Sequence, residues 1–127
     1  MRWISRSQIL DLHNEMVSEF GGKAGVRDDS LLDSALGAPF QTFGGSDLFP
    51  DILEKSARLA YGIIRNHPFY DGNKRMGLHL MLLFQELNGI RIKYKDKEVV
   101  DLIVSVASGQ TDEECLYGWV KDHIQRK

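Results

Sequence analysis

The sequence predicts an all-α protein: a compact single domain of about six helices, with a short hairpin or loop ahead of the central helices. Two observations predict this class. Apolar residues recur at the i, i+3, i+4 spacing of an amphipathic helix over most of the chain. The 127 residues also fit one domain, residues 1–127, because two halves would each fall near the lower size limit for an independent core.

The first part of the chain is expected to hold two helices and an irregular segment. An apolar stripe runs from residue 7 to residue 20, and the Gly21-Gly22 pair ends it. A shorter helix is expected over residues 28–36. Proline and glycine then interrupt residues 37–50, which predicts a loop or a short hairpin with its turn at Gly44-Gly45.

Two long helices are expected in the middle of the chain. The first covers residues 51–66 and ends at His67-Pro68, because a residue before proline avoids helical geometry. The second covers Asn73 to Leu87 and is apolar on nearly every side, which predicts that it is the central, buried helix.

The C-terminal part is expected to add a short extended piece over residues 90–94 and two more helices. One runs from about Asp96 to a stop at Gly109. The last begins at a capping box formed by Thr111 and Glu114.

Composition limits the classes of function. The formal net charge of -2 gives no general electrostatic reason to bind nucleic acid or an anionic membrane, so we expect neither partner. Cys115 is the single cysteine, cannot form an internal disulfide and is expected to be a small core residue. No signal peptide and no apolar run of about 18 residues is present, which predicts a cytoplasmic location.

The stretch NHPFYDGNKRMG, residues 66–77, gathers polar groups where the second long helix begins. Lys74 and Arg75 stand in the first helical turn, where the backbone dipole is positive and cations cost stability unless an anion is near. The free N–H groups of the same turn point toward the loop, and Gly72 would allow a ligand close to the backbone. Together these features predict a pocket for the phosphates of a nucleotide.

Two further residues suit such a pocket. Asp71 beside phosphates is a candidate ligand for Mg²⁺, although it would serve equally well as the N-cap of the helix. His67 is the nearby side chain of the type that accepts a proton near neutral pH, so it is the candidate general base. Phe69 is expected to anchor the loop on the core, and His13 and His79 are expected to be packed structural histidines.

The residues HPFYDGNKR resemble the signature of the Fic family, His-x-Phe-x-Asp/Glu-Gly-Asn-x-Arg. The start MRWIS, the GG pair and the segment LFQELNG extend the similarity to the death-on-curing (Doc) toxins within that family. The resemblance implies a Fic-type bundle, with His67 as the catalytic histidine and Asp71 as the magnesium-binding acid. It also implies that Gly72 and Asn73 form an anion-binding turn and that Arg75 binds phosphate.

Two departures from the common Fic pattern resemble Doc. Lys74 replaces a glycine and Leu78 replaces a second arginine; in Doc the nucleotide is thought to lie reversed, so that the γ-phosphate faces the target. The resemblance therefore implies a toxin that transfers phosphate from ATP, with Lys74 and Arg75 as catalytic cations, to a threonine of elongation factor Tu. Gly72, an ordinary Fic feature, leaves AMP transfer open, and a catalytically silent nucleotide- or antitoxin-binding regulator is a second alternative.

The resemblance implies partners as well. In the family a hairpin called the flap docks the target, which implies target contacts at Phe40, Gln41, Thr42 and Phe43. The alternative is a plain loop whose two aromatics cover the core. Arg65 is a possible phosphate or target contact. No Ser or Thr has a Glu four residues later, so the family's internal inhibitory motif is missing and a separate antitoxin of the Phd type is expected.

Overall fold

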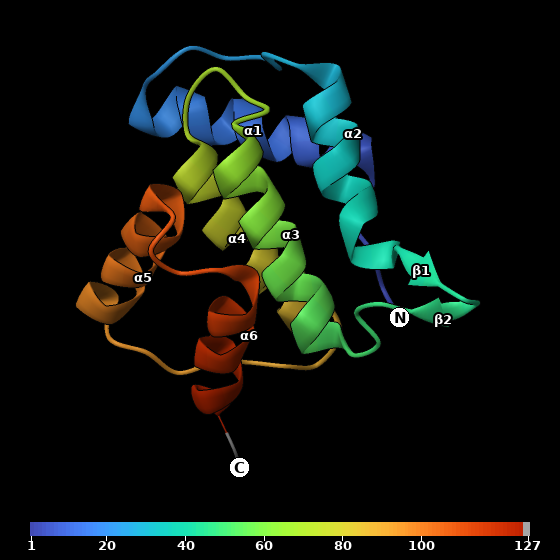
Figure 1. Cartoon of the computed structure of the whole chain (residues 1–127). Coiled ribbons are helices and arrows are strands. Elements are labelled where there is room, and N and C mark those ends of the chain that lie inside the picture. Colours follow the sequence, from blue (N-terminus) through green and yellow to red (C-terminus); the bar gives the residue numbers. More distant parts are fainter. Residues whose placement is uncertain (126–127) are drawn as a thin grey trace.

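The computed structural model describes residues 1–125 and places six α-helices and one two-stranded hairpin in that part of the chain (Figure 1). The predicted all-α class is confirmed, and each predicted helix lies within one or two residues of its expected range. The elements are α1 (Arg6–Phe20), α2 (Asp29–Gly37), the short 3-10 helix η1 (Ala38–Phe40), β1 (Thr42–Phe43), β2 (Ser46–Asp47), α3 (Ile52–Asn66), α4 (Asn73–Leu87), α5 (Asp96–Ser108) and α6 (Glu113–Asp122).

The central helix is α3, not α4 as the apolar pattern predicted. α3 packs against α2, α4, α5 and α6, and Figure 1 shows it in front of α4 with the other helices around it. Close packing explains this position: a Cβ on Gly62 would lie 3.1 Å from the Cβ of Ala35, and a Cβ on Gly77 would lie 2.6 Å from Cγ1 of Ile64. α4 is less enclosed than predicted, since Leu87 at its end is exposed.

The buried side chains of the bundle form two clusters, and both contain residues of α3 and α4. The first joins α1, α2, α3 and α4 and includes Phe69 from the loop between α3 and α4. The second joins α3 and α4 to α5 and α6. Because both clusters contain side chains of α3 and α4, the two ends of the loop between these helices are held by the core. Within residues 1–125, no helix is long and apolar enough to cross a membrane.

The predicted start of α6 was wrong by one residue. Asp112, not Thr111, is the N-cap: its carboxylate accepts the N–H of Cys115 at 2.8 Å. This hydrogen bond holds the pKa of Asp112 below its usual range. Thr111 instead shares a hydrogen bond with the hydroxyl of Ser105 at 2.6 Å. Cys115 is exposed, so the prediction of a core cysteine was also wrong.

The irregular segment does contain the predicted hairpin. β1 and β2 pair antiparallel, with Thr42 opposite Asp47 and Phe43 opposite Ser46 around the Gly44-Gly45 turn. The hairpin projects near the N-terminal end of α3, whereas the loop between α3 and α4 lies at the other end of that helix (Figure 1). Residues 90–94 form no full strand and contribute one bridge, between Ile92 and Ile124.

Candidate functional site

The loop between α3 and α4 begins with a strained histidine. His67 ends α3 in the left-handed conformation, with φ 50° and ψ 55°, and it is the only non-glycine residue of the described chain with positive φ. Such a conformation costs about 1–3 kcal/mol and persists where the surrounding structure enforces it. Because strained residues of this kind cluster at active sites, the backbone supports the assignment of His67, whose side chain is exposed.

Arg27 provides the contacts that hold His67. Its guanidinium donates from Nε to the carbonyl of His67 at 2.8 Å and from Nη2 to the carbonyl of Asn66 at 3.1 Å. The N–H of Arg27 also donates to the carbonyl of Pro68 at 2.7 Å, beside a bridge between Val26 and Phe69. The sequence did not predict a role for Arg27, because no local pattern indicates a contact between residues that are 40 positions apart.

A second set of contacts, made by His13 of α1 and by Asn73, holds the rest of the loop in place. His13 of α1 is buried, stacks on Phe69 with ring centroids 4.0 Å apart, and donates from Nε2 to the carbonyl of Asp71 at 2.8 Å. The Asn73 side chain donates to the carbonyl of Phe69 and accepts its N–H, both at 3.0 Å. The predicted packing of His13 and Phe69 is therefore confirmed. The Asn73 amide is used inside the loop, so its backbone N–H is the donor that remains for an anion.

Asp71 presents its carboxylate at the surface. Oδ2 accepts the N–H of Lys23 at 2.6 Å, and Asp71 does not cap α4, whose N-cap is Gly72. Residues 1–125 contain no group of three or more His, Cys, Asp or Glu side chains that could hold a metal ion, so no pair of such side chains joins Asp71 in a site made of protein ligands alone. A single exposed carboxylate still fits Mg²⁺ bound together with phosphate, because this ion commonly takes one or two carboxylates and completes its shell with phosphate oxygens and water.

Gly72 has a packing reason to be glycine. Its φ is 80°, and a Cβ at this position would lie 2.4 Å from Cε of Met16 on α1. On one side of Gly72 the flexible end of Met16 fills the space, and on the other side Gly72 borders the cavity that it shares with Lys74 and Arg75. The expectation that a ligand approaches the backbone here stays a prediction.

Lys74 and Arg75 occupy the first turn of α4 with exposed side chains, as predicted. The backbone N–H groups of residues 73–75 precede the first intrahelical bond, which Met76 makes to the carbonyl of Gly72 at 2.8 Å. Arg75 lies over the ring of Phe20, with Cζ 3.7 Å from the ring centroid. These donors border a cavity of about 390 Å³ that residues 72–75 share with Leu78 of α4 and Val100, Ile103 and Val104 of α5.

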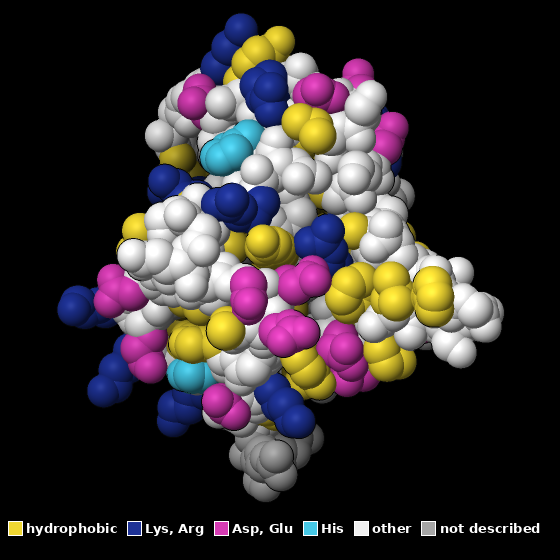
Figure 2. All heavy atoms as spheres, in the orientation of Figure 1, with side chains coloured by type: hydrophobic (Ala, Val, Ile, Leu, Met, Phe, Trp, Pro, Cys, Tyr) yellow, Lys and Arg dark blue, Asp and Glu magenta, His cyan; other side chains and the backbone are white. Residues whose placement is uncertain are grey.

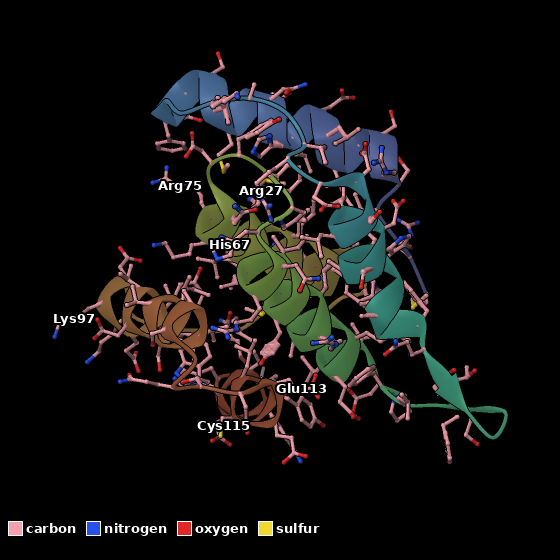
Figure 3. All side chains as sticks on the ribbon, turned by 45° about the horizontal axis from the view of Figure 1, so that its top comes forward. Arg27, His67, Arg75, Lys97, Glu113 and Cys115 are labelled. Carbon is pink, nitrogen blue, oxygen red and sulfur yellow. The ribbon has the colours of Figure 1, made fainter. Side chains whose placement is uncertain are left out.

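The figures show the same grouping. In Figure 3, Arg27, His67 and Arg75 lie around the loop between α3 and α4, while Lys97, Glu113 and Cys115 lie away from it on α5 and α6. Figure 2 shows Lys and Arg side chains around a histidine over that loop, and acidic side chains gathered lower on the same face. Lys and Arg side chains thus gather around the loop, with some acidic side chains among them at the top of the same face.

The structure does not bring the predicted flap to this loop. Phe40 packs edge-on against Trp3 with ring centroids 4.6 Å apart, so it covers the core, whereas Phe43 is 79% exposed. Gln41 and Thr42 are exposed as well. Because the hairpin lies at the opposite end of α3 from His67 (Figure 1), the target-binding role of residues 40–43 stays a prediction.

Two other residues remain, of which Arg65 makes a contact that the sequence did not predict and His79 differs from its predicted surroundings. Arg65 is exposed and donates from Nη1 to the carbonyl of Ala107 at 2.9 Å, so one of its donors stabilises the C-terminal turn of α5. Its role as a phosphate or target contact stays a prediction. His79 is exposed and not packed, because it faces the groove between α1 and α4.

Comparison with known proteins gives this site a family. The model of the Fic/DOC family matches residues 3–85, from the segment before α1 to the last turns of α4, and so includes the whole loop. The chain belongs to the Fic/DOC family. It is 33% identical to the "Protein kinase doc" of Escherichia phage P1 over 110 residues, which are 87% of this chain and 86% of that protein. It is 36% identical to the "Toxin Doc" of Mycolicibacterium smegmatis over 95 residues, 73% of each chain. In this Fic/DOC protein, α5 and α6 lie beyond the family match.

Proposed function

We propose that the protein is the toxin of a toxin-antitoxin module and acts as a phosphotransferase, moving the γ-phosphate of ATP to a protein hydroxyl. The observation that carries the proposal is the pair Lys74 and Arg75 at the positive end of α4, next to the strained His67. Two relatives support it: one carries the name protein kinase and the other the name toxin.

In this mechanism His67 accepts the proton of the target hydroxyl as its oxygen bonds to the γ-phosphorus, and ADP leaves. Arg27 keeps His67 at the mouth of the site through the carbonyl contact of 2.8 Å. The N–H groups of residues 73–75, with the side chains of Lys74 and Arg75, stabilise the charge that spreads over the phosphoryl oxygens. Arg75 leaves its contact with Phe20 to reach the phosphates.

Asp71 is the residue that would hold Mg²⁺. When bound, the ion would neutralise phosphate charge and fix the orientation of the donor. The hydrogen bond from the N–H of Lys23 to Oδ2 orients the carboxylate for this task. Arg65 and residues Phe40–Phe43 are proposed as contacts to the target protein.

Phosphate transfer is favoured over AMP transfer by two side chains. Lys74 fills the place where glycine is usual, and Leu78 borders the cavity with an apolar side chain where a second arginine would bind phosphate. Gly72, the feature that left AMP transfer open, has a φ of 80°, a backbone conformation that glycine adopts without strain whichever group is transferred, so it does not discriminate between the two reactions.

The proposed target is a threonine of a translation factor such as elongation factor Tu, which places the action in the cytoplasm and arrests translation. A separate antitoxin of the Phd type would restrain the toxin, since the sequence has no internal inhibitory Ser/Thr-x-x-x-Glu motif.

Labelled ATP tests the proposal. The purified protein is incubated with a cell lysate, Mg²⁺ and ATP labelled on either the γ- or the α-phosphate. Transfer of the γ label alone supports the kinase, whereas transfer of the α label supports AMP transfer. Absence of both labels would favour the silent regulator. His79→Ala, an exposed histidine on the same helix as Arg75, serves as the matched control for His67→Ala.

A further inference from the structure

A buried lysine in the first half of α3 takes no part in the proposed chemistry. Lys55 is 5% exposed, and lysine is almost never buried without partners, because its charge loses its hydration. Its ammonium donates to the carbonyl of Phe49 and pairs with the carboxylate of Asp47 at 3.4 Å. It also lies 5.8 Å from the ring centroid of Phe40. In the part of the chain that the structure describes, the ammonium makes these contacts only with residues 40–49, the segment that carries the hairpin.

The hairpin has little of its own that would hold it in place. β1 and β2 contain two residues each, and all four residues are exposed, so neither strand buries an apolar face against the bundle. A two-stranded hairpin without such packing is at best marginally stable in water. The contacts that fix it therefore lie at its base, where the N–H of Leu48 donates to the carbonyl of Gln41 at 2.9 Å.

Two anchors hold that base, one on each side. Phe40, just before β1, packs edge-on against Trp3. On the other side, the carboxylate of Asp47 in β2 and the carbonyl of Phe49 both meet the ammonium of Lys55. Because this ammonium also lies near the ring of Phe40, it joins the two sides of the hairpin. One buried charge therefore ties the orientation of the hairpin to α3, the central helix.

We propose that Lys55 is a positioning residue for target recognition, because its ammonium holds the hairpin in the orientation in which the protein target meets it. The inference rests on the proposed function, which assigns target contacts to Phe40–Phe43. Phe43 is 79% exposed and Leu48 is 48% exposed, so the hairpin presents apolar surface to a partner. A hairpin held rigidly loses less conformational freedom when the target binds, which favours binding.

Distance separates this role from the chemistry. α3 has 15 residues and is therefore about 22 Å long, and the hairpin and His67 lie at its opposite ends (Figure 1). A change at Lys55 should then weaken the binding of a protein that reaches both ends, while ATP binding and the phosphoryl step stay as they are. A merely structural lysine would behave differently, since a smaller folded fraction lowers the apparent kcat and leaves both KM values unchanged.

Lys55→Met tests the role, because methionine keeps an unbranched apolar side chain and removes the ammonium. The Asp47 side chain is 51% exposed and stays hydrated without its partner, so the melting temperature is expected to remain within about 4 °C of the wild type. The N–H of Leu48 is expected to exchange with solvent at least about tenfold faster, because the base of the hairpin opens. The KM for elongation factor Tu should rise roughly tenfold, while kcat and the KM for ATP stay unchanged.

Further variants separate the ion pair from the fold. Asp47→Asn removes only the charge of the half-exposed partner and should raise the KM for the target a few-fold, which guards against a misfolded Lys55→Met protein. Adding Asp47→Asn to Lys55→Met should raise this KM no further, because the pair is already broken. Lys97→Met, at a 90% exposed side chain on α5 away from the hairpin, is the matched control and should behave as the wild type does (Figure 3).

Three results would overturn the inference. Unchanged exchange at Leu48 in Lys55→Met would show that the hairpin does not depend on the ammonium. A lower kcat with both KM values unchanged would show that the lysine is only structural. Additive increases of the target KM in the double variant would show that Asp47 acts on the target without Lys55. Each of these leaves label transfer by the wild type intact, whereas absence of that transfer would remove the proposed function, and the exchange rates would still show whether Lys55 holds the hairpin.

Discussion

His13 of α1 is predicted to hold the active-site loop in place. It is 1% exposed, donates to the carbonyl of Asp71 at 2.8 Å and stacks on Phe69 at 4.0 Å. His13→Phe keeps the ring and its stack but removes the donor. Leaving a carbonyl unpaired costs about 1–3 kcal/mol, and the lower end applies because Asp71 lies at the surface, where water reaches it.

His13→Ala also removes the buried ring and leaves a cavity under Phe69. Adding that loss to the broken hydrogen bond gives a decrease in the free energy of unfolding of about 3 kcal/mol. For a chain of this size each kcal/mol lowers the melting temperature by about 4 °C. Urea unfolding of the wild type, His13→Phe and His13→Ala measures the two contributions separately, and label transfer from ATP reports the geometry of the loop.

The exposed His79 supplies the control, since His79→Ala should change the free energy of unfolding by no more than about 0.5 kcal/mol. The reasoning is refuted if His13→Ala loses less than about 1 kcal/mol. It is also refuted if His13→Phe is as unstable as His13→Ala, because the ring would then contribute nothing.

Three further predictions concern neighbouring features. Arg27→Ala should lower kcat at least tenfold while the KM for nucleotide stays constant, because Arg27 contacts the carbonyl of His67 and not the phosphates; an equal rise in KM would contradict this. Gly72→Ala should lower the free energy of unfolding by about 1–2 kcal/mol, because alanine is strained at the positive φ of this position. Adding Met16→Ala should recover only the part of this loss that comes from the contact between the new Cβ and Met16. Full recovery would show that the backbone conformation adds no strain. Asp112→Asn keeps a capping oxygen but removes the carboxylate, whose pKa is lowered in the folded protein. The extra stability of the wild type over this variant should therefore be present above about pH 4 and vanish as the pH falls further. Urea unfolding measures it, and a pH-independent difference would refute the prediction.

The helices and the hairpin were predictable because their signals are local. Apolar spacing, the Gly21-Gly22 pair and the bond between His67 and Pro68 each act within a few residues, and the structure places element ends close to them. The start of α6 differs by one residue because Thr111 and Asp112 are adjacent and both are residue types that cap helices. In the structure the hydroxyl of Thr111 is hydrogen-bonded to Ser105, and Asp112 is the cap.

The charged part of the site was predictable for the same reason. Lys74 and Arg75 stand in the first turn of α4, where the positive end of the helix dipole disfavours cations unless an anion is bound. The supporting contacts were not. His13 meets Asp71 across 58 residues and Arg27 meets His67 across 40, and neither partner shows a local pattern. Apolar content predicts α4 as the centre of the bundle, but small residues such as Gly62 let neighbouring helices approach α3 closely.

Mass spectrometry of the modified protein tests the central claim most directly. The purified chain is incubated with ATP, Mg²⁺ and elongation factor Tu, and the modified peptide is sequenced. The account predicts a phosphorylated hydroxyl with the wild type and none with His67→Ala, while His79→Ala modifies the same residue as the wild type. An adenylylated peptide, or phosphorylation that persists in His67→Ala, would contradict it.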